Sequence, residues 1–167
     1  MRLLLLTALT LAMTACNMPG GAMAGNNAGK KTGCTAGTPL GQSEAGLNLT
    51  RLCIKSGKKT HSFTAEIAAT GPQQAQGLMF RRSLADDAGM IFPFPQARPA
   101  SFWMKNTVIP LDIIFIGADG TIESIGENAV PYSLDTVSSK GSVQAVLELR
   151  GGLTSELGIK AGDTISW

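Results

Sequence analysis

The chain has 167 residues, of which 44% are apolar, 16% charged and 5% aromatic. This length excludes two large domains, because ordinary domains have roughly 100 to 200 residues. Lys and Arg number 14 against 12 Asp and Glu, which gives a formal net charge of +2. Such a charge is too small and too evenly spread for a surface that follows a phosphate backbone, so we expect no nucleic-acid partner.

The beginning of the chain has the composition of a secretory signal. Arg2 precedes an apolar stretch, and the small residues Thr14 and Ala15 precede Cys16. The stretch is too short to span a bilayer as a helix, which is typical of a signal peptide. Its end resembles the lipobox of bacterial lipoproteins, although Met13 stands where Leu is usual. The resemblance implies that Cys16 becomes the first mature residue and carries acyl chains that hold the protein at a membrane.

We therefore predict an exported protein that is held at the cell envelope by a lipid anchor. Asn17 after the cysteine favours the outer membrane, facing the periplasm, if the cell has two membranes. The alternative is an ordinary secreted protein in which Cys16 has no special role. The predicted segments are a signal peptide at 1–15, a lipidated Cys with a tether at 16–46, and one domain at 47–167. Residues 17–46 include eight Gly and two Pro, and they bury too little apolar surface to become ordered, so this tether should be flexible.

Cys34 and Cys53 are the two remaining thiols. An exported protein meets an oxidising compartment, where two spare cysteines tend to pair. We predict a Cys34–Cys53 disulfide that fastens the end of the tether to the domain. The alternative is a buried Cys53 beside a free Cys34.

The predicted domain consists mainly of short strands, as its alternating apolar and polar residues indicate. Thr70 and Gln73 have the spacing of a helix capping box, and Asp119-Gly120 is typical of a two-residue hairpin with positive φ at both positions. The predicted strands are 47–55, 61–68, 90–94, 101–105, 111–117, 121–126, 143–150 and 163–167, and the predicted helices are 73–80 and 154–157. This pattern favours an all-β fold, an antiparallel β-sandwich or jelly-roll-like barrel with one or two short helices.

Four motifs occur in order along this domain. They are Gly-Leu-Met-Phe-Arg at 77–81, Gly-Met-Ile-Phe at 89–92, Ser-Phe-Trp-Met-Lys-Asn-Thr at 101–107 followed by Ile-Pro-Leu-Asp at 109–112, and a last motif that runs from Leu-Glu-Leu at 147–149 to Gly-Asp at 162–163. Together they resemble the DUF192 (UPF0127) family over roughly residues 54–167. The resemblance implies an all-β fold similar to a jelly-roll sandwich, frequent export and no established biochemical activity.

Trp103, Lys105 and Asn106 place an aromatic face beside a cation and an amide. Such a set suits a sugar or a small anionic ligand in a partly apolar cleft. With Arg81 and Asp112 added, these residues form our predicted ligand-binding cleft. The main hypothesis is therefore a β-domain that binds a small molecule or glycan without acting as an enzyme. The alternative for Trp103 is that it merely covers the core.

Three carboxylates, those of Glu66, Asp112 and Glu148, lie in otherwise apolar strands. A buried carboxylate needs a partner, and Arg81 and Lys105 are the candidates. If the three instead cluster, Asp112 with Glu148 or Glu66 would suit acid and base catalysis by a carbohydrate-active hydrolase. A structural partner of another envelope protein is a further alternative, and the sequence leaves the oligomeric state open.

Metal or cofactor chemistry has little support in the sequence. Met79, Met90 and Met104 could bind Cu(I) through their thioethers, but Met also fills irregular gaps in cores. His61 is the single His, too few for a typical closed zinc site and a weak basis for a nucleophilic triad. We expect no metal and no cofactor.

Overall fold

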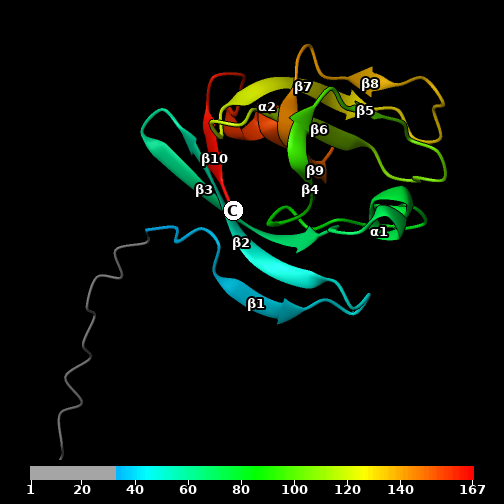
Figure 1. Cartoon of the computed structure of the whole chain (residues 1–167), viewed down its shortest axis with the longest axis horizontal. Helices are drawn as coiled ribbons and strands as arrows, with labels where there is room; N and C mark the ends of the chain where they lie inside the picture. The colour runs from blue at the N-terminus through cyan, green and yellow to red at the C-terminus, as the bar shows by residue number, and fades with distance from the viewer. Residues whose placement is uncertain (1–32) are drawn as a thin grey trace, which may run out of the picture. The chain divides into compact units, whose positions relative to one another are not determined.

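A computed structural model describes residues 33–167 of the chain (Figure 1). The predicted signal peptide, Cys16 and the first half of the predicted tether lie outside the described residues. Within residues 33–167, no helix is both long and apolar enough to cross a membrane.

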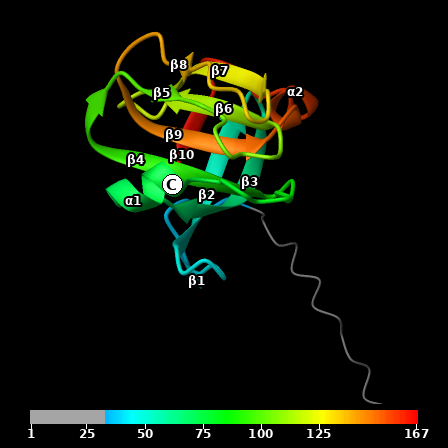
Figure 2. The same cartoon turned by 90° about the vertical axis from the view of Figure 1, so that its right-hand side faces the viewer.

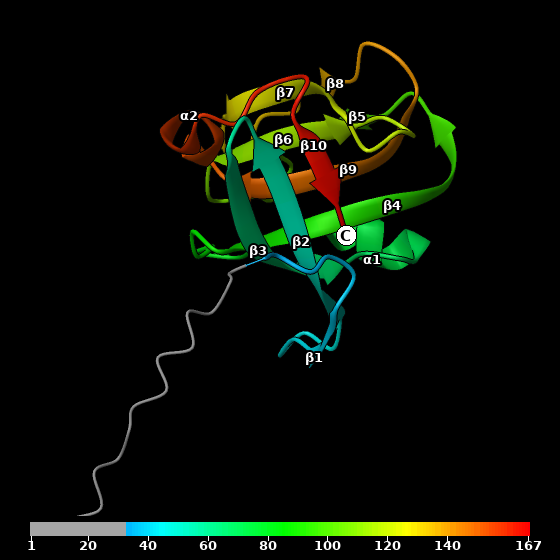
Figure 3. The ribbon, with the colours of Figure 1, turned by 90° about the vertical axis from the view of Figure 1, so that its left-hand side faces the viewer.

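The described residues form ten strands and two short helices. The strands are β1 (Pro39–Gln42), β2 (Asn48–Ser56), β3 (Lys59–Ile67), β4 (Ala88–Arg98), β5 (Ser101–Phe102), β6 (Leu111–Ile116), β7 (Ile122–Ala129), β8 (Val137–Ser138), β9 (Val143–Arg150) and β10 (Thr164–Ser166). The helices are α1 (Gly71–Gln76) and α2 (Leu153–Leu157), which lie on opposite sides of the molecule (Figures 2 and 3).

Eight strands make one mixed sheet in the order β1-β2-β3-β4-β9-β6-β7, with β10 paired to β2. β5 and β8 form a separate two-stranded sheet. The fold is thus mostly β, as predicted, but the main sheet is mixed and not antiparallel as predicted. β3 and β4 run parallel because the connection that contains α1 crosses over between them, and neither of the two sheets in residues 33–167 closes into a barrel.

The main sheet is curled, so that β10 approaches both β2 and the start of β7 (Figure 3). Ile165 N donates to Gly120 O at 2.7 Å, and Ile122 N donates to Asp163 O at 2.8 Å. The contacts bring the two ends of the sheet together around an apolar interior without completing a barrel.

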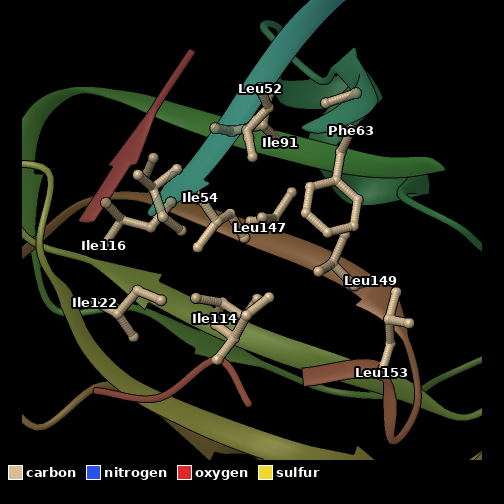
Figure 4. Close-up of a cluster of buried hydrophobic side chains, with 14 residues drawn as sticks. Leu52, Ile54, Phe63, Ile91, Ile114, Ile116, Ile122, Leu147, Leu149 and Leu153 are labelled. Carbon is tan, nitrogen blue, oxygen red and sulfur yellow. The ribbon is translucent and has the colours of Figure 1, made fainter. Parts of the chain in front are cut away.

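Apolar side chains cover both faces of the central strands β4, β9 and β6. One cluster includes Leu52, Ile54, Phe63, Ile91, Ile114, Leu147 and Leu149 (Figure 4). The other includes Met90, Phe92, Phe94, Phe102, Ile113, Phe115 and Val146. Successive side chains in a strand alternate between faces, so every residue of β6 is buried. We call these the Leu147 face and the Val146 face.

Most predicted elements match the structure within a few residues, and the exceptions have local causes. Thr70 and Gln73 make the predicted capping box, but α1 ends at Gln76 because Gly77 leaves the helical conformation at φ 49°. The predicted strand at 101–105 ends at Phe102, since Met104 to Thr107 form a turn closed by a Thr107 N to Met104 O hydrogen bond of 3.0 Å.

The turn at Asp119-Gly120 is also longer than the predicted two-residue hairpin turn. Only Gly120 has positive φ, at 78°, and Gly117 N donates to Thr121 O at 2.9 Å. Asp119 instead accepts hydrogen bonds from Thr121 through its carboxylate.

The predicted Cys34–Cys53 disulfide is present, with 5.8 Å between the two Cα atoms. It joins residue 34 to β2. The structure also places β1 inside the segment expected to be a tether, where Pro39 pairs with Thr50 of β2. The ordered domain therefore begins before residue 47.

Candidate functional site

A pocket of about 300 Å³ lies beside α1, over the Val146 face of β4 and β9. Its lining comes from Gln74 to Met79, the phenyl rings of Phe92, Phe94 and Phe102, and the side chains of Arg98, Ser101, Trp103, Thr107 and Glu148. We call it the Glu148 pocket. Four of its lining residues are aromatic in a chain that has only 5% aromatic residues, so the pocket is enriched in flat apolar surface.

Glu148 is the buried carboxyl group of this pocket. It stands in β9 directly opposite Met90 of β4 and Ile113 of β6, which places it on the Val146 face. The residue is 5% exposed, and its Oε2 has no hydrogen-bond partner among the described residues. Burial raises the pKa of Glu148 to about 8. The carboxyl group is therefore mainly protonated at neutral pH and can both donate and accept a hydrogen bond.

Trp103 forms an aromatic wall at the mouth of the pocket. Its side chain is 49% exposed, and Lys105 Nζ lies 5.1 Å from the ring centroid, within the range of a cation–π contact. The neighbouring Phe102 is fixed edge-to-face against Phe92, with 5.1 Å between ring centroids. A rigid strand end thus presents a half-exposed indole beside the pocket.

Arg98 contributes the charged part of the lining. Its guanidinium carbon lies 4.0 Å from the centroid of the Phe94 ring. Both residues belong to β4, whose last residues leave the core and become exposed. Sequence reasoning did not single out Arg98, Phe92, Phe94 or Phe102 as site residues.

Asp112, which we predicted to bind ligand or to act in catalysis, does not line the Glu148 pocket. It pairs with Leu149, one residue beyond Glu148, and therefore faces the other side of the sheet. Its fully buried carboxylate accepts hydrogen bonds from the Asn128, Gly152 and Thr154 amides, each at 2.8 Å, and from Thr154 Oγ1 at 2.7 Å. These bonds join β6 to the end of β7 and the start of α2, so Asp112 has a structural role.

Arg81 forms an ion pair with Glu66, with 2.5 Å between Nη2 and Oε2. The Glu66 side chain is 9% exposed and that of Arg81 is 32% exposed. Arg81 lines a second pocket of about 350 Å³, together with Leu47 and Pro72, rather than the Glu148 pocket. Arg81 mainly neutralises the buried Glu66 carboxylate. Such a pair was the structural alternative that we predicted for these carboxylates.

The two-carboxylate arrangement expected of a hydrolase does not form around the Glu148 pocket. Glu66, Met90 and Glu148 occupy one row across three strands, with the Met90 side chain between the carboxyl groups. Of the three carboxylates considered, only Glu148 lines this pocket. Residues 33–167 also hold no group of three or more His, Cys, Asp or Glu side chains placed to bind a metal ion.

Asn106 occupies the turn that follows Trp103 and does not line the pocket. It has φ of 57°, its carbonyl accepts from Phe80 N at 2.9 Å, and its Nδ2 lies 3.7 Å from Met79 Sδ. Asn106 therefore links this turn to the segment after α1. Of the five residues predicted to bind ligand, Trp103 lines the pocket and Lys105 contacts the Trp103 ring.

Comparison with known proteins gives the family. The DUF192 family, described as uncharacterized ACR, matches residues 52–167, more than two thirds of the chain. The chain belongs to the DUF192 family.

This DUF192 protein is also similar to two solved structures. One is a protein of unknown function from Novosphingobium aromaticivorans DSM 12444, at 45% identity and a TM-score of 0.77, covering 83% of this chain and 99% of that one. The other is a candidate transcription regulator from Sinorhizobium meliloti 1021, at 45% identity and a TM-score of 0.68, covering 70% of this chain and 91% of that one. No curated protein matches the chain.

Proposed function

We propose that this DUF192 protein is a lipid-anchored binding protein of the cell envelope. Its Glu148 pocket takes a neutral, hydroxylated small molecule such as a sugar and does not transform it. Cys16 carries the lipid, and the domain faces the periplasm from the outer membrane where the cell has two membranes. The observation that carries the binding proposal is that Glu148 lines a pocket with aromatic walls, while its buried Oε2 has no hydrogen-bond partner among residues 33–167.

The unpartnered carboxyl group favours a ligand that supplies its missing hydrogen bond. Leaving a buried polar atom unpaired costs about 1–3 kcal/mol, which a ligand hydroxyl group would recover. The residues around Glu148 in β9 are mostly apolar and buried. An apolar side chain at this position would therefore pack as well as Glu148 does. A binding role explains why a carboxyl group occupies this position.

The same group argues for a sugar over the small anion that we also considered. When Glu148 is protonated it can bind a hydroxyl group, and when it is ionised it repels an anion. Trp103 adds an exposed aromatic face, on which the apolar face of a sugar ring can stack. Arg98 and Lys105 beside the mouth can bind the outer hydroxyl groups.

A thermal-shift screen of mono- and disaccharides against the mature protein tests the proposal. A ligand that binds only the folded state at a hundred times its Kd stabilises it by about 2.7 kcal/mol. We expect at least one sugar to raise the Tm of the native protein, and Trp103→Ala to abolish that shift. Tyr132→Ala, which removes an exposed aromatic ring that does not line the pocket, is the matched control and should retain it.

The anchor has its own test. Cells that produce the protein are labelled with a fatty-acid analogue, and the native protein is compared with Cys16→Ser. Label on the native chain that is lost in Cys16→Ser supports the anchor, whereas equal labelling of both, or of neither, refutes it.

A further inference from the structure

The large apolar side chains that are exposed within residues 33–167 come from only three loops. They are Phe80 after α1, Trp103 after β5, and Val130, Tyr132 and Leu134 between β7 and β8. Each of these side chains is between 49% and 68% exposed. We call them the apolar rim. Large apolar side chains that gather at one place on a surface usually mark a contact site.

Backbone hydrogen bonds join the three loops through the turn from Met104 to Thr107. Phe80 N donates to Asn106 O at 2.9 Å, and Tyr132 N donates to Thr107 O at 3.1 Å. Met104 N completes the connection by donating to Ser133 O at 3.0 Å. The three loops therefore lie side by side, and Trp103 belongs both to the apolar rim and to the lining of the Glu148 pocket.

Two of the three exposed aromatic residues of the apolar rim also have an unusual backbone conformation. Phe80 and Tyr132 both have positive φ, 64° and 61°, which non-glycine residues rarely adopt. Each of them donates its amide to a carbonyl of the same turn. Strained backbone conformations that neighbouring hydrogen bonds maintain are characteristic of functional sites. Here both strained residues carry exposed aromatic rings.

Within two residues of the rim side chains the charges are mainly positive, whereas Asp86 and Asp87 lie farther along the loop after α1. Residues 77–82, 103–107 and 130–135 contain Arg81, Arg82 and Lys105 against the single acid Asp135. Arg81 is neutralised by Glu66, but Arg82 and Lys105 are exposed, and Lys105 lies beside Trp103.

Aromatic rings with neighbouring cations are typical of protein surfaces that contact a bilayer. Trp and Tyr favour the boundary between apolar and aqueous phases, and Lys and Arg are attracted to anionic lipids. We infer that the apolar rim docks on the surface of a lipid bilayer, with Trp103 and Tyr132 at the level of the headgroups. The proposed anchor on Cys16 would raise the local concentration of the rim at that surface. Docking also brings the mouth of the Glu148 pocket to the headgroup layer.

Vesicle binding of the full mature chain tests this inference apart from both the anchor and the sugar. Cys16→Ser removes the acylated residue, and Trp167→Phe leaves Trp103 as the only Trp, because the chain has two. With vesicles of phosphatidylglycerol and phosphatidylethanolamine, we expect the Trp103 emission to shift to the blue and to be quenched by brominated lipid. No sugar is present, so a failure of the proposed pocket would leave this result unchanged.

Two further variants identify the surface. Tyr132→Ser with Leu134→Ser should weaken vesicle binding about tenfold or more, because two exposed apolar side chains no longer enter the interface. Lys105→Gln should weaken it about fivefold, and the loss should shrink in high salt. Lys160→Gln removes an exposed cation outside the three loops and is the matched control, which should bind like the parent.

Emission from Trp103 that neither shifts nor is quenched on anionic vesicles would overturn the inference. Vesicle binding that the Tyr132→Ser, Leu134→Ser variant retains in full would also overturn it, because contact would then occur elsewhere. Self-association through the rim in the absence of vesicle binding would assign this surface to a protein contact instead.

Discussion

Asp112 in β6 accepts hydrogen bonds from both the amide and the hydroxyl group of Thr154, at 2.8 and 2.7 Å, and so fixes the start of α2 to the sheet. Gly152, which has φ of 80°, adds its amide to the other carboxylate oxygen. Every hydrogen bond to the Asp112 carboxylate is donated by an N–H or O–H group. Both side-chain oxygens of residue 112 must therefore be acceptors.

Asp112→Asn should therefore destabilise the fold strongly. The new amide group would face donors, and losing bonds to a charged acceptor should cost about 3 kcal/mol. For a domain of this size, that loss lowers the Tm by roughly 10 °C. Thermal unfolding of Asp112→Asn beside Asp135→Asn, an exposed control, measures the effect. Equal Tm values for the two variants would show that the Asp112 network contributes nothing.

The Arg81–Glu66 pair should behave as a coupled unit. Arg81→Gln leaves a buried carboxylate unpaired and should reduce the free energy of unfolding by about 2 kcal/mol, less than for a fully buried pair because Arg81 is partly exposed. Adding Glu66→Gln should recover part of that loss. A double-mutant cycle in urea measures the coupling, and additive single losses would refute it.

Glu148 should make stability depend on pH in the direction opposite to most carboxylates. Burial raises its pKa from the ordinary 4.5 to about 8 in the folded protein, so folding favours the protonated form. The contribution of this protonated Glu148 to the free energy of unfolding is fully present below pH 4.5 and is lost as pH rises toward about 8, a change on the order of several kcal/mol.

Glu148→Gln is the isosteric test, because the amide group does not titrate. The unfolding free energy of the native protein minus that of Glu148→Gln should decrease between about pH 4.5 and 8. Chemical denaturation at several pH values measures this difference. Curves that stay parallel across that range would mean that Glu148 titrates at an ordinary pKa.

The Cys34–Cys53 disulfide closes a loop with a sequence separation of 19 residues. The chain-entropy treatment assigns such a loop about 3 kcal/mol, so a reductant should lower the Tm of the native protein. Cys34→Ser should match the reduced protein and show no further response to reductant. Mass spectrometry of the exported protein without reductant should find the linked peptides, and free thiols at both positions would contradict the bridge.

Local signals in the sequence predicted most of the elements. The Thr70 and Gln73 spacing located the start of α1, and alternation located β3, because these patterns depend on nearby residues alone. The parallel pairing of β3 with β4 could not be predicted in this way. It depends on where the chain goes after α1, which is set by packing between residues distant in sequence.

The site was predicted in fragments. The sequence indicated Trp103 as a ligand contact and Glu148 as a carboxylate needing a partner, but it assigned them to different hypotheses. They line one pocket because β5 folds over the Val146 face, where Phe102 packs against Phe92. The partners of Asp112 were also inaccessible to sequence reasoning, since two of its donors are backbone amides about 40 residues away, and any residue but Pro carries an amide.

Saturation-transfer NMR of the mature protein with a mixture of sugars tests the central claim most directly, because it reports contact with the folded protein at neutral pH. We expect transfer to at least one sugar, loss of that transfer in Trp103→Ala, and about tenfold weaker binding in Glu148→Leu, which cannot supply the hydrogen bond. Transfer to none of the sugars, or transfer that survives both substitutions, would contradict a sugar site at Glu148.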